Sequence, residues 1–402
     1  MEKKKSIFSY YKPYKKIFFA DMFFAIMASI ITLVIPLVVR YITSTVIYYE
    51  TDEAFRVILK LGLMMTVLIL FQCYCNYFIA NYGHVMGAKI EYDMRAEIFA
   101  HYQKLPFSFY DNQKVGQLLS RITSDLFDIT ELLHHGPENV VISAMKFIGA
   151  FVILFTISPK LTFAAFALIP FMFLYAWFFN RKMKKAFARN RVKIADINAQ
   201  IEDNLSGIRV VKSFANESVE EEKFKVGNDG FLAAKKDSYL YMGGYHSGLT
   251  AFINMITVIV LVTGGILITK AQVSVTDLVT FLLYISIMTD PVRTMIDFAE
   301  MFQNGYSGYE RFQEILAIEP DIQDSQGSEE LTDVKGTIDF ENVSFQYEEN
   351  TEKVLSHIDL HVDAGEYLAL VGSSGAGKTT LCNLIPRFYD VTGGSIKVDG
   401  KD

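Results

Sequence analysis

Long apolar stretches dominate the first 301 residues, and they constrain the fold more than any other feature of this chain. About 20 apolar residues in a helix cross the hydrocarbon core of a bilayer, where only a helix or a closed barrel satisfies its own backbone hydrogen bonds. Six stretches come close to this length or exceed it: residues 17–39, 61–82, 139–157, 161–180, 247–269 and 278–301. The sequence therefore predicts a polytopic α-helical membrane domain with six transmembrane helices.

Composition and charge agree with a membrane protein. Hydrophobic residues make up 51% of the chain and charged residues 21%, which is more apolar than an average soluble domain. The formal net charge of −7 gives no indication of nucleic acid as a partner. Cys73, Cys75 and Cys382 form neither a disulfide framework nor a metal-binding spacing.

Basic residues predict how the chain is oriented in the membrane. Lysines precede the first apolar stretch, and a dense basic run at residues 181–193 follows the fourth. Because such residues are enriched on the cytoplasmic side, we expect a multi-pass protein of the cell (cytoplasmic) membrane with both termini in the cytoplasm. Stretch 17–39 is too long for a signal-peptide core and has no convincing cleavage site, which indicates an uncleaved anchor.

Two long intervals, residues 83–138 and 181–246, are then cytoplasmic. In the second interval, Ile197, Ile201 and Leu205 recur at four-residue steps, so we expect the fourth transmembrane helix to continue well beyond the bilayer. The first interval has the same helical character, interrupted at Pro106. Helices that extend this far beyond the bilayer need another protein surface to pack against.

The C-terminal part has a different composition. We assign residues 1–318 to the membrane domain, the acidic and aperiodic segment 319–336 to a linker, and residues 337–402 to a partial α/β P-loop domain. Alternating apolar residues predict half-buried strands around 338–345 and 358–362. The fully apolar segment 367–371 predicts a buried strand that leads into a glycine-rich loop and a helix.

The glycine-rich loop is the motif that carries chemistry. The sequence GSSGAGKT matches G-x-x-x-x-G-K-[ST], in which glycines let backbone N–H groups converge on phosphate oxygens. Lys378 is placed to reach the β- and γ-phosphates, and the Thr379 hydroxyl to bind Mg²⁺. The ATP-binding residues predicted here are Gly372, Ser373, Ser374, Gly375, Ala376, Gly377, Lys378, Thr379 and Thr380.

Taken together, these motifs resemble one family, the ATP-binding cassette (ABC) exporters of the bacterial multidrug and lipid-flippase type. The resemblance rests on GSSGAGKTT, LIPRFYDVTGGSIKVDG, VSFQY, GIRVVKSFANE and VGQLLSRITSDL, and it covers nearly the whole chain as a half-transporter. It implies that Tyr347 stacks on adenine, although an ordinary strand tyrosine is the alternative. It also implies that the segments near 109–116 and 213–221 couple the membrane domain to nucleotide domains, the alternative being solvated hairpins.

The sequence departs from this family at its end. Members continue with a glutamine loop, a signature segment, a strand with an aspartate and a catalytic glutamate, and a switch histidine. None of these is found in the 402 residues. The resemblance therefore implies a chain truncated within the nucleotide-binding domain, with no catalytic residue of its own and no ATP hydrolysis when alone.

Charged residues in the sixth apolar stretch form a second candidate site. Asp290, Arg293 and Asp297 lie three and four residues apart, so they share one face of a helix. Intramembrane charges usually face a cavity or one another. We favour an ion pair of Arg293 with Asp290 or Asp297 over contact with substrate or simple exposure. His134 and His135 show no carboxylate or cysteine pattern that would indicate a metal site.

These observations predict ATP-driven export of a hydrophobic or amphipathic substrate, a drug, lipid or peptide, with ATP and Mg²⁺ as cofactors. The family resemblance implies a second half-transporter as partner, in a homodimer or a heterodimer, within a lipid bilayer. The alternative is a catalytically inert, truncated membrane subunit that dimerises with a complete transporter and regulates it. A membrane-anchored nucleotide kinase fits less well, because acceptor-site residues have little room after residue 385.

Overall fold

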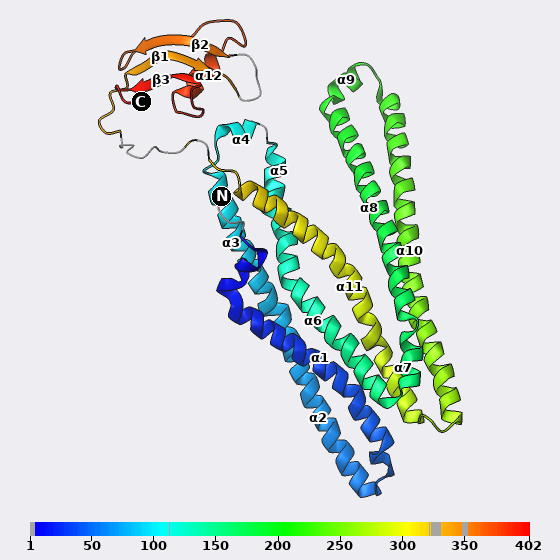
Figure 1. The fold of residues 1–402 in the computed structure, drawn as a ribbon. Coiled ribbons are helices and arrows are strands. Elements are labelled where there is room, and N and C mark those ends of the chain that lie inside the picture. The colour runs from blue at the N-terminus through cyan, green and yellow to red at the C-terminus, as the bar shows by residue number, and fades with distance from the viewer. Residues whose placement is uncertain (1–4, 112, 321, 323–330, 348–352) are drawn as a thin grey trace. The chain divides into compact units, whose positions relative to one another are not determined.

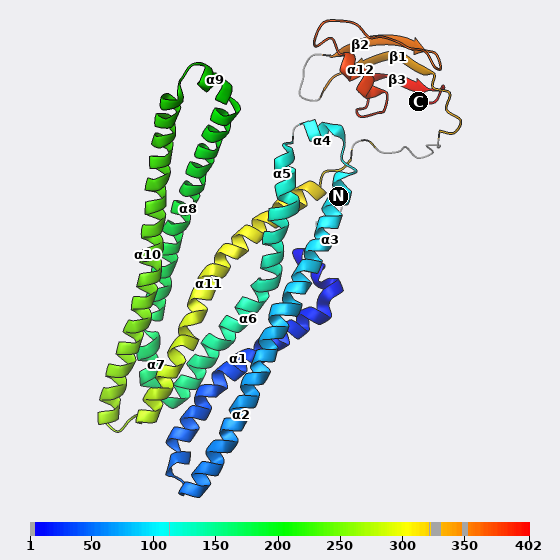
Figure 2. The ribbon, with the colours of Figure 1, turned by 180° about the vertical axis from the view of Figure 1, so that it is seen from behind.

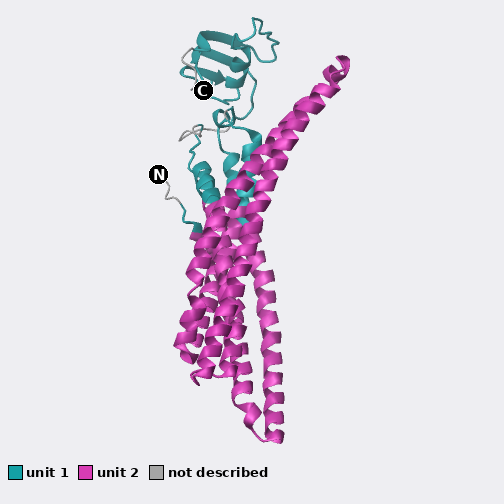
Figure 3. Ribbon diagram, turned by 90° about the vertical axis from the view of Figure 1, so that its right-hand side faces the viewer, with its two compact units in different colours: residues 1–7, 91–127, 307–402 teal, residues 8–90, 128–306 magenta. Residues whose placement is uncertain are grey.

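The structure is a computed structural model that describes residues 5–111, 113–320, 322, 331–347 and 353–402. Its helices are long, and its strands are confined to the C-terminal region (Figure 1). Contacts divide the chain into two compact units, drawn in two colours in Figure 3. One unit, the helical unit, comprises residues 8–90 and 128–306, and the other, the nucleotide unit, comprises 1–7, 91–127 and 307–402.

The prediction of six transmembrane helices is confirmed. Six helical segments are long and apolar enough to cross a membrane, and they run Ile7–Tyr48, Thr51–Tyr102, Val115–Ile157, Pro159–Ser206, Glu217–Thr269 and Val275–Leu316. Their principal helices are α1 (Lys15–Ser44), α2 (Thr51–Phe78), α3 (His84–Tyr102), α6 (Leu126–Ile157), α7 (Pro159–Phe166), α8 (Ile169–Ser206), α10 (Glu217–Thr269) and α11 (Val275–Leu316). The chain is therefore a multi-pass membrane protein.

Short elements join or modify the long helices. They are η1 (Ile7–Tyr14), η2 (Val46–Tyr48), the π-helical η3 (Ile79–Gly83), α4 (Phe107–Asp111), α5 (Val115–Ser120), the π-helical η4 (Arg121–Asp125) and α9 (Ile208–Ser213). The predicted interruption at Pro106 is confirmed, because α3 ends at Tyr102 and α4 begins at Phe107. Pro291, in contrast, lies inside α11, which continues through it as one helix.

Within the helical unit, α8 and α10 run side by side over most of their length (Figures 1 and 2). Their close approach depends on glycine, since a Cβ atom at Gly248 would lie 2.2 Å from the ring of Tyr175. Tyr175 in turn donates a 2.8 Å hydrogen bond from its hydroxyl to the carbonyl oxygen of Gly244. The α8–α10 pair confirms that the fourth helix extends far beyond a bilayer's thickness, as its periodicity predicts.

Polar contacts and an apolar core hold α11 to α1 in the same unit. The Arg40 guanidinium donates a 2.8 Å hydrogen bond from Nε to Asp277 Oδ1, and the Tyr284 hydroxyl donates to the carbonyl oxygen of Leu33. Tyr284 is fully buried, and it belongs to a core cluster that also contains Phe281, Leu154 and Met172. These polar contacts and the core cluster fix where the two helices meet.

The nucleotide unit carries a three-stranded antiparallel sheet in the order β2-β1-β3, formed by β1 (Ile338–Phe345), β2 (Leu355–Val362) and β3 (Gly393–Val398), with helix α12 (Lys378–Leu384). The two strands predicted from alternation are confirmed. Phe340 and Val343 are both buried although three residues apart, because the register shifts between them at a bulge where Asn342 has φ +50°. Residues 321 and 323–330 of the predicted linker lie outside the described residues, and the domain boundaries at 318 and 336 stay a prediction.

Candidate nucleotide site and its contacts

The glycine-rich loop leads from an extended segment into α12, as the sequence predicts. Gly375 and Gly377 have φ values of +83° and +82°, a region that residues with a side chain rarely adopt. A Cβ atom at Gly377 would also lie 2.8 Å from Leu355 Cδ2 on β2. Glycine at 377 is therefore required both by the backbone turn and by the packing of the loop against the sheet.

Lys378 lies across the loop. Its ammonium group donates hydrogen bonds of 2.9 Å to the carbonyl oxygen of Gly372 and 2.7 Å to that of Ser373. Lys378 is half-buried and is the first residue of α12, whereas the adjoining Thr379 is exposed. The positive charge of Lys378 is thus held inside the turn of the loop.

The strand predicted at residues 367–371 is wrong. This segment forms no ladder with β1, β2 or β3, and the side chains of Tyr367 and Val371 are 102% and 90% exposed. A fully apolar strand is stable where neighbouring strands and helices cover both of its faces. None of the three described strands pairs with this segment, so the apolar pattern has no such cover here and the segment stays unpaired.

Tyr347 lies next to the loop. Its hydroxyl is 3.1 Å from Thr380 Oγ1 on α12, and its ring packs edge-on against Phe345 and Tyr389, at centroid distances of 4.8 Å and 5.3 Å. The predicted adenine contact and the predicted phosphate loop are therefore brought together within one unit. Thr380 is buried in this contact, whereas the neighbouring Thr379 is exposed.

The helical segment after Pro106 contacts the same aromatic group. The rings of Phe107 on α4 and Phe388 stack with centroids 4.1 Å apart and planes inclined by 22°. The Tyr389 hydroxyl donates a 2.6 Å hydrogen bond to Asp111 Oδ2 at the end of α4. Burial, followed by this hydrogen bond, raises the pKa of Tyr389, so its hydroxyl stays protonated and donating at neutral pH.

The second segment predicted to couple the membrane domain to nucleotide domains, near residues 213–221, lies at the end of α9 and the start of α10, and its coupling role stays a prediction. The short helix α9 spans Ile208–Ser213, and α10 already begins at Glu217. Residues near 213–221 are therefore a turn followed by the first residues of a long helix. Apolar side chains are exposed at this tip, with Val210 61% and Phe214 72% exposed.

The three charges of the sixth apolar stretch do not form the predicted close ion pair, although Arg293 interacts electrostatically with Asp297. Asp290, Arg293 and Asp297 are all exposed on α11, and the described residues show no ion pair between Arg293 and either aspartate. Asp297 instead lines an open pocket of about 410 Å³, together with the carboxylates of Glu131 and Glu300 among others. The favoured internal ion pair is absent in the described chain.

Comparison with known proteins decides the family. A family model for the ABC transporter transmembrane region matches residues 18–292, and a second model, described as ABC transporter, matches residues 355–402. The chain is 38% identical over 396 residues to YwjA, an uncharacterised ABC transporter ATP-binding protein of Bacillus subtilis, and the alignment covers 98% of this chain and 68% of that protein. The chain belongs to the ABC transporter family.

Other ABC relatives are exporters by name. YgaD of Bacillus subtilis, provisionally named a multidrug export ATP-binding/permease protein, is 29% identical over 405 residues, covering 99% of this chain and 69% of its own length. A Staphylococcus aureus protein with the same provisional name is 30% identical over 400 residues, covering 98% of this chain and 69% of its own length. ABC membership implies nucleotide binding and ATPase activity, and ABC exporters generally act as dimers in a lipid membrane.

Sequence reasoning missed part of the ABC site. It did not single out Phe388 and Tyr389, which contact α4, nor Phe107. Asp111 lies within the predicted coupling segment 109–116, but its bond to Tyr389 was not predicted. A local signal was present, because an aromatic pair directly follows the helix of the phosphate loop and a second aromatic group directly follows Pro106. The two groups meet through tertiary contacts such as the hydrogen bond between Tyr389 and Asp111, which are 278 residues apart in the sequence.

Proposed function

We propose that this ABC chain exports a hydrophobic or amphipathic substrate across the cytoplasmic membrane as one subunit of a dimeric, ATP-driven transporter. The observation that carries the proposal is the contact of α4 with Phe388 and Tyr389, next to the phosphate loop. Helix α4 follows the cytoplasmic extension of the second transmembrane helix, so a movement of the nucleotide-binding residues is passed to a membrane-spanning element.

ATP and Mg²⁺ are the proposed ligands of the loop. Backbone N–H groups between Gly372 and Gly377 bind phosphate oxygens, Lys378 neutralises the β- and γ-phosphates, and Thr379 contributes its hydroxyl to Mg²⁺. In this assignment Lys378 leaves the carbonyl oxygens of Gly372 and Ser373 when phosphate arrives. Tyr347 stacks on the adenine ring.

A second subunit is the proposed partner of the exposed tip at α9. Val210 and Phe214 are apolar and solvent-exposed, which is unfavourable for a cytoplasmic surface that remains bare. The proposed contact of this tip with a nucleotide domain of a second half-transporter covers them. Asp290, Arg293 and Asp297 are proposed to face the substrate path of that dimer, and the N- and C-termini the cytoplasm.

Binding of ATP to membranes that contain the chain tests the loop. Lys378→Ala is expected to weaken ATP binding at least about tenfold, since it removes a charge-assisted contact of about 1.5–3 kcal/mol. Lys335→Ala, which changes an exposed lysine outside the loop, is the matched control. An unchanged ATP affinity of Lys378→Ala would sink the assignment of the loop.

Transport itself needs a separate measurement. The chain, reconstituted into proteoliposomes with a complete half-transporter as its partner and supplied with Mg·ATP, is expected to support ATP hydrolysis that becomes faster when an amphipathic substrate is added. ATP binding without any hydrolysis, together with inhibition of a complete relative added to the same vesicles, would instead favour the regulatory subunit that the sequence left as the alternative.

A further inference from the structure

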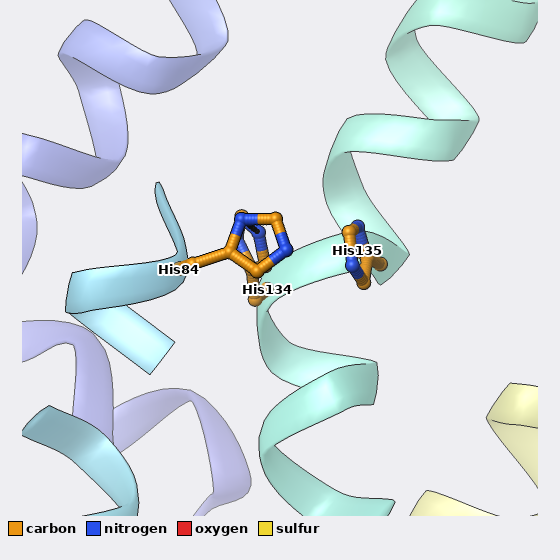
Figure 4. A group of neighbouring side chains, drawn as sticks. All are labelled: His84, His134 and His135. Carbon is orange, nitrogen blue, oxygen red and sulfur yellow. Dashed lines mark hydrogen bonds between the residues drawn. The ribbon is translucent and has the colours of Figure 1, made fainter. Parts of the chain in front are cut away.

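A buried cluster of ionisable side chains lies where three helices of the helical unit meet. Asp21 comes from α1, and His134 and Glu138 come from α6. Figure 4 shows the three histidines of the cluster: His84, the first residue of α3, beside His134 and His135. The sequence expectation that no carboxylates surround His134 and His135 is wrong. Glu131 and Glu138 lie within 4.0 Å of their rings, and Asp21 approaches from another helix.

Asp21 is the most unusual member of this cluster. Its side chain is 0% exposed, and among the described residues neither Oδ1 nor Oδ2 has a hydrogen-bond partner. A buried carboxylate without a partner is unfavourable by several kcal/mol unless a cation or a proton neutralises it. An ionisable residue within an otherwise apolar transmembrane stretch generally marks a functional site.

Glu138 and His134 offer two more buried ligand atoms. His134 Nδ1 is buried without a hydrogen-bond partner among the described residues, and the buried Glu138 Oε2 lies 3.4 Å from His135 Nδ1 and 3.9 Å from His134 Nε2. One ligand atom each from Asp21, His134 and Glu138 lie within 4.8 Å of one another. Two helices, α1 and α6, thus bring three buried ligand atoms to one small volume.

A hydrogen bond with His84 determines which ring nitrogen of His134 is free to bind a metal ion. The Nε2 atom of His134 is 3.1 Å from His84 Nδ1. When His134 donates this hydrogen bond from Nε2, its Nδ1 atom keeps a lone pair on the side of Asp21, since a Cβ atom at Gly83 would lie 3.1 Å from Nδ1 and 2.9 Å from Asp21 Oδ1. Glu138 Oε2 lies 3.9 Å from Nε2 of the same ring. Metal-binding histidines are oriented in this way by a hydrogen bond from their second nitrogen.

The backbone between α2 and α3 makes room for this arrangement. A Cβ atom at Gly83 would lie 2.4 Å from His134 Cε1 and 2.9 Å from Asp21 Oδ1. Gly83 ends the π-helical η3, and such single π-turns occur often at functional sites. The absence of a side chain here lets His134 and Asp21 face each other directly.

We propose that Asp21, His134 and Glu138 bind a divalent transition-metal ion, with His84 as the positioning residue for His134. Two carboxylates and a neutral imidazole neutralise a divalent ion without leaving net charge in a buried site. Imidazole together with carboxylate selects Zn²⁺ and its transition-metal neighbours over Mg²⁺ and Ca²⁺, which prefer oxygen ligands only. The bound ion would fix α1 to α6 beside the start of α3.

Zinc binding by the whole chain tests the site. Chain purified in detergent and stripped of metal is dialysed against Zn²⁺, and the bound zinc is measured by elemental analysis. We expect about one Zn²⁺ per chain, an increase of the unfolding temperature with Zn²⁺ but not with Mg²⁺, and a d–d absorption spectrum with nitrogen ligation when Co²⁺ replaces zinc. Failure of the unsubstituted chain to bind zinc overturns the proposal, whatever the variants do.

Variants locate the ion. Asp21→Asn and His134→Gln keep the side-chain size and are expected to lower zinc affinity more than about 100-fold, whereas His84→Gln costs about 10–100-fold. His361→Gln is the matched control, because the exposed His361 lies 2.5 Å and 3.2 Å from the carboxylates of Asp339 and Asp363 and is itself able to hold a surface ion. Zinc lost from His361→Gln but kept by Asp21→Asn and His134→Gln contradicts the proposed site.

Discussion

Tyr389 donates a 2.6 Å hydrogen bond from its hydroxyl to Oδ2 of Asp111, at the end of the short helix α4. The ring of Tyr389 also packs 5.3 Å from that of Tyr347, whose hydroxyl is 3.1 Å from Thr380 in the first turn of α12. A continuous set of side-chain contacts therefore joins α4 to the helix that begins at Lys378. Whether this set transmits ATP binding depends on energetic coupling, which substitutions can measure.

The first prediction concerns the Tyr389–Asp111 hydrogen bond. Tyr389→Phe keeps the ring packing and removes only the hydroxyl, so we expect ATP affinity within about twofold of the original and a reduced stimulation of ATPase by substrate. In a double-mutant cycle with Asp111→Ala, the coupling energy should be about 1 kcal/mol. Purely additive effects of the two substitutions would show that the hydrogen bond carries no coupling.

The second prediction separates the ring of Tyr347 from its hydroxyl. Tyr347→Phe removes the contact with Thr380 and keeps the aromatic face, so ATP binding should change less than about threefold. Tyr347→Ala removes the stacking surface, and ATP binding should weaken about tenfold or more, since base–aromatic stacking contributes about 1–3 kcal/mol. Equal affinities for ATP in Tyr347→Ala and the unsubstituted chain would leave Tyr347 as an ordinary packing residue.

The sequence predicts features that are local along the chain. The length of each apolar stretch predicts the six transmembrane helices. The spacing of Gly372, Gly377 and Lys378 predicts the turn that begins α12. Both features depend only on residues that are close together in the sequence. Segment 367–371 was mispredicted for the opposite reason: an apolar strand depends on neighbours that the local pattern does not specify.

Contacts between distant residues are what the sequence does not predict. Asp21 lies in an apolar stretch that gives no hint of a partner, and His84 meets His134 across 50 residues. The register shift at Asn342 is similar, since alternation alone places Phe340 and Val343 on opposite faces. Each of these features depends on the tertiary arrangement of helices or strands.

The third prediction is a pH dependence at the edge of the sheet. Asp399 accepts hydrogen bonds from the backbone N–H groups of Thr337, Gly336 and Lys335 and from the Thr337 hydroxyl, which lower the pKa of its carboxyl to about 2. A carboxyl with a lowered pKa stabilises the fold above its unfolded pKa of about 3.9, and this stabilisation is lost as the pH falls toward about 2.

Thermal unfolding across pH measures this effect. Asp399→Ala should unfold at a lower temperature than the unsubstituted chain by a constant amount above about pH 5, and the two should converge between about pH 4 and pH 2. Asp402→Ala, which changes a nearby exposed carboxylate, is the control. A difference that persists undiminished at about pH 2 would assign the effect to something other than the charge of Asp399.

The fourth prediction concerns Asp125, which holds α11 to the end of η4 within the nucleotide unit. Its carboxylate accepts hydrogen bonds of 2.8 Å and 2.6 Å from Arg311, and Arg121 lies 3.3 Å away. Asp125→Ala leaves two guanidinium groups without this carboxylate, so we expect it to lower the free energy of unfolding by about 3 kcal/mol. Lys104→Ala, an exposed substitution, should change it by less than about 0.5 kcal/mol, and equal unfolding temperatures for both variants would contradict the prediction.

The last prediction concerns Arg293, for which the structure changes the expected outcome. An arginine in a buried ion pair destabilises the fold when it is removed, but Arg293 is exposed on α11 and forms no ion pair with Asp290 or Asp297 among the described residues. Arg293→Ala should therefore leave the unfolding temperature of the substrate-free chain almost unchanged, because exposed charges without a close ion pair contribute little. If Arg293 faces the substrate path of a dimer, the same substitution alters the stimulation of ATPase by substrate while basal hydrolysis is kept. A large loss of stability without substrate would instead restore the structural role that the spacing of these three charges first suggested.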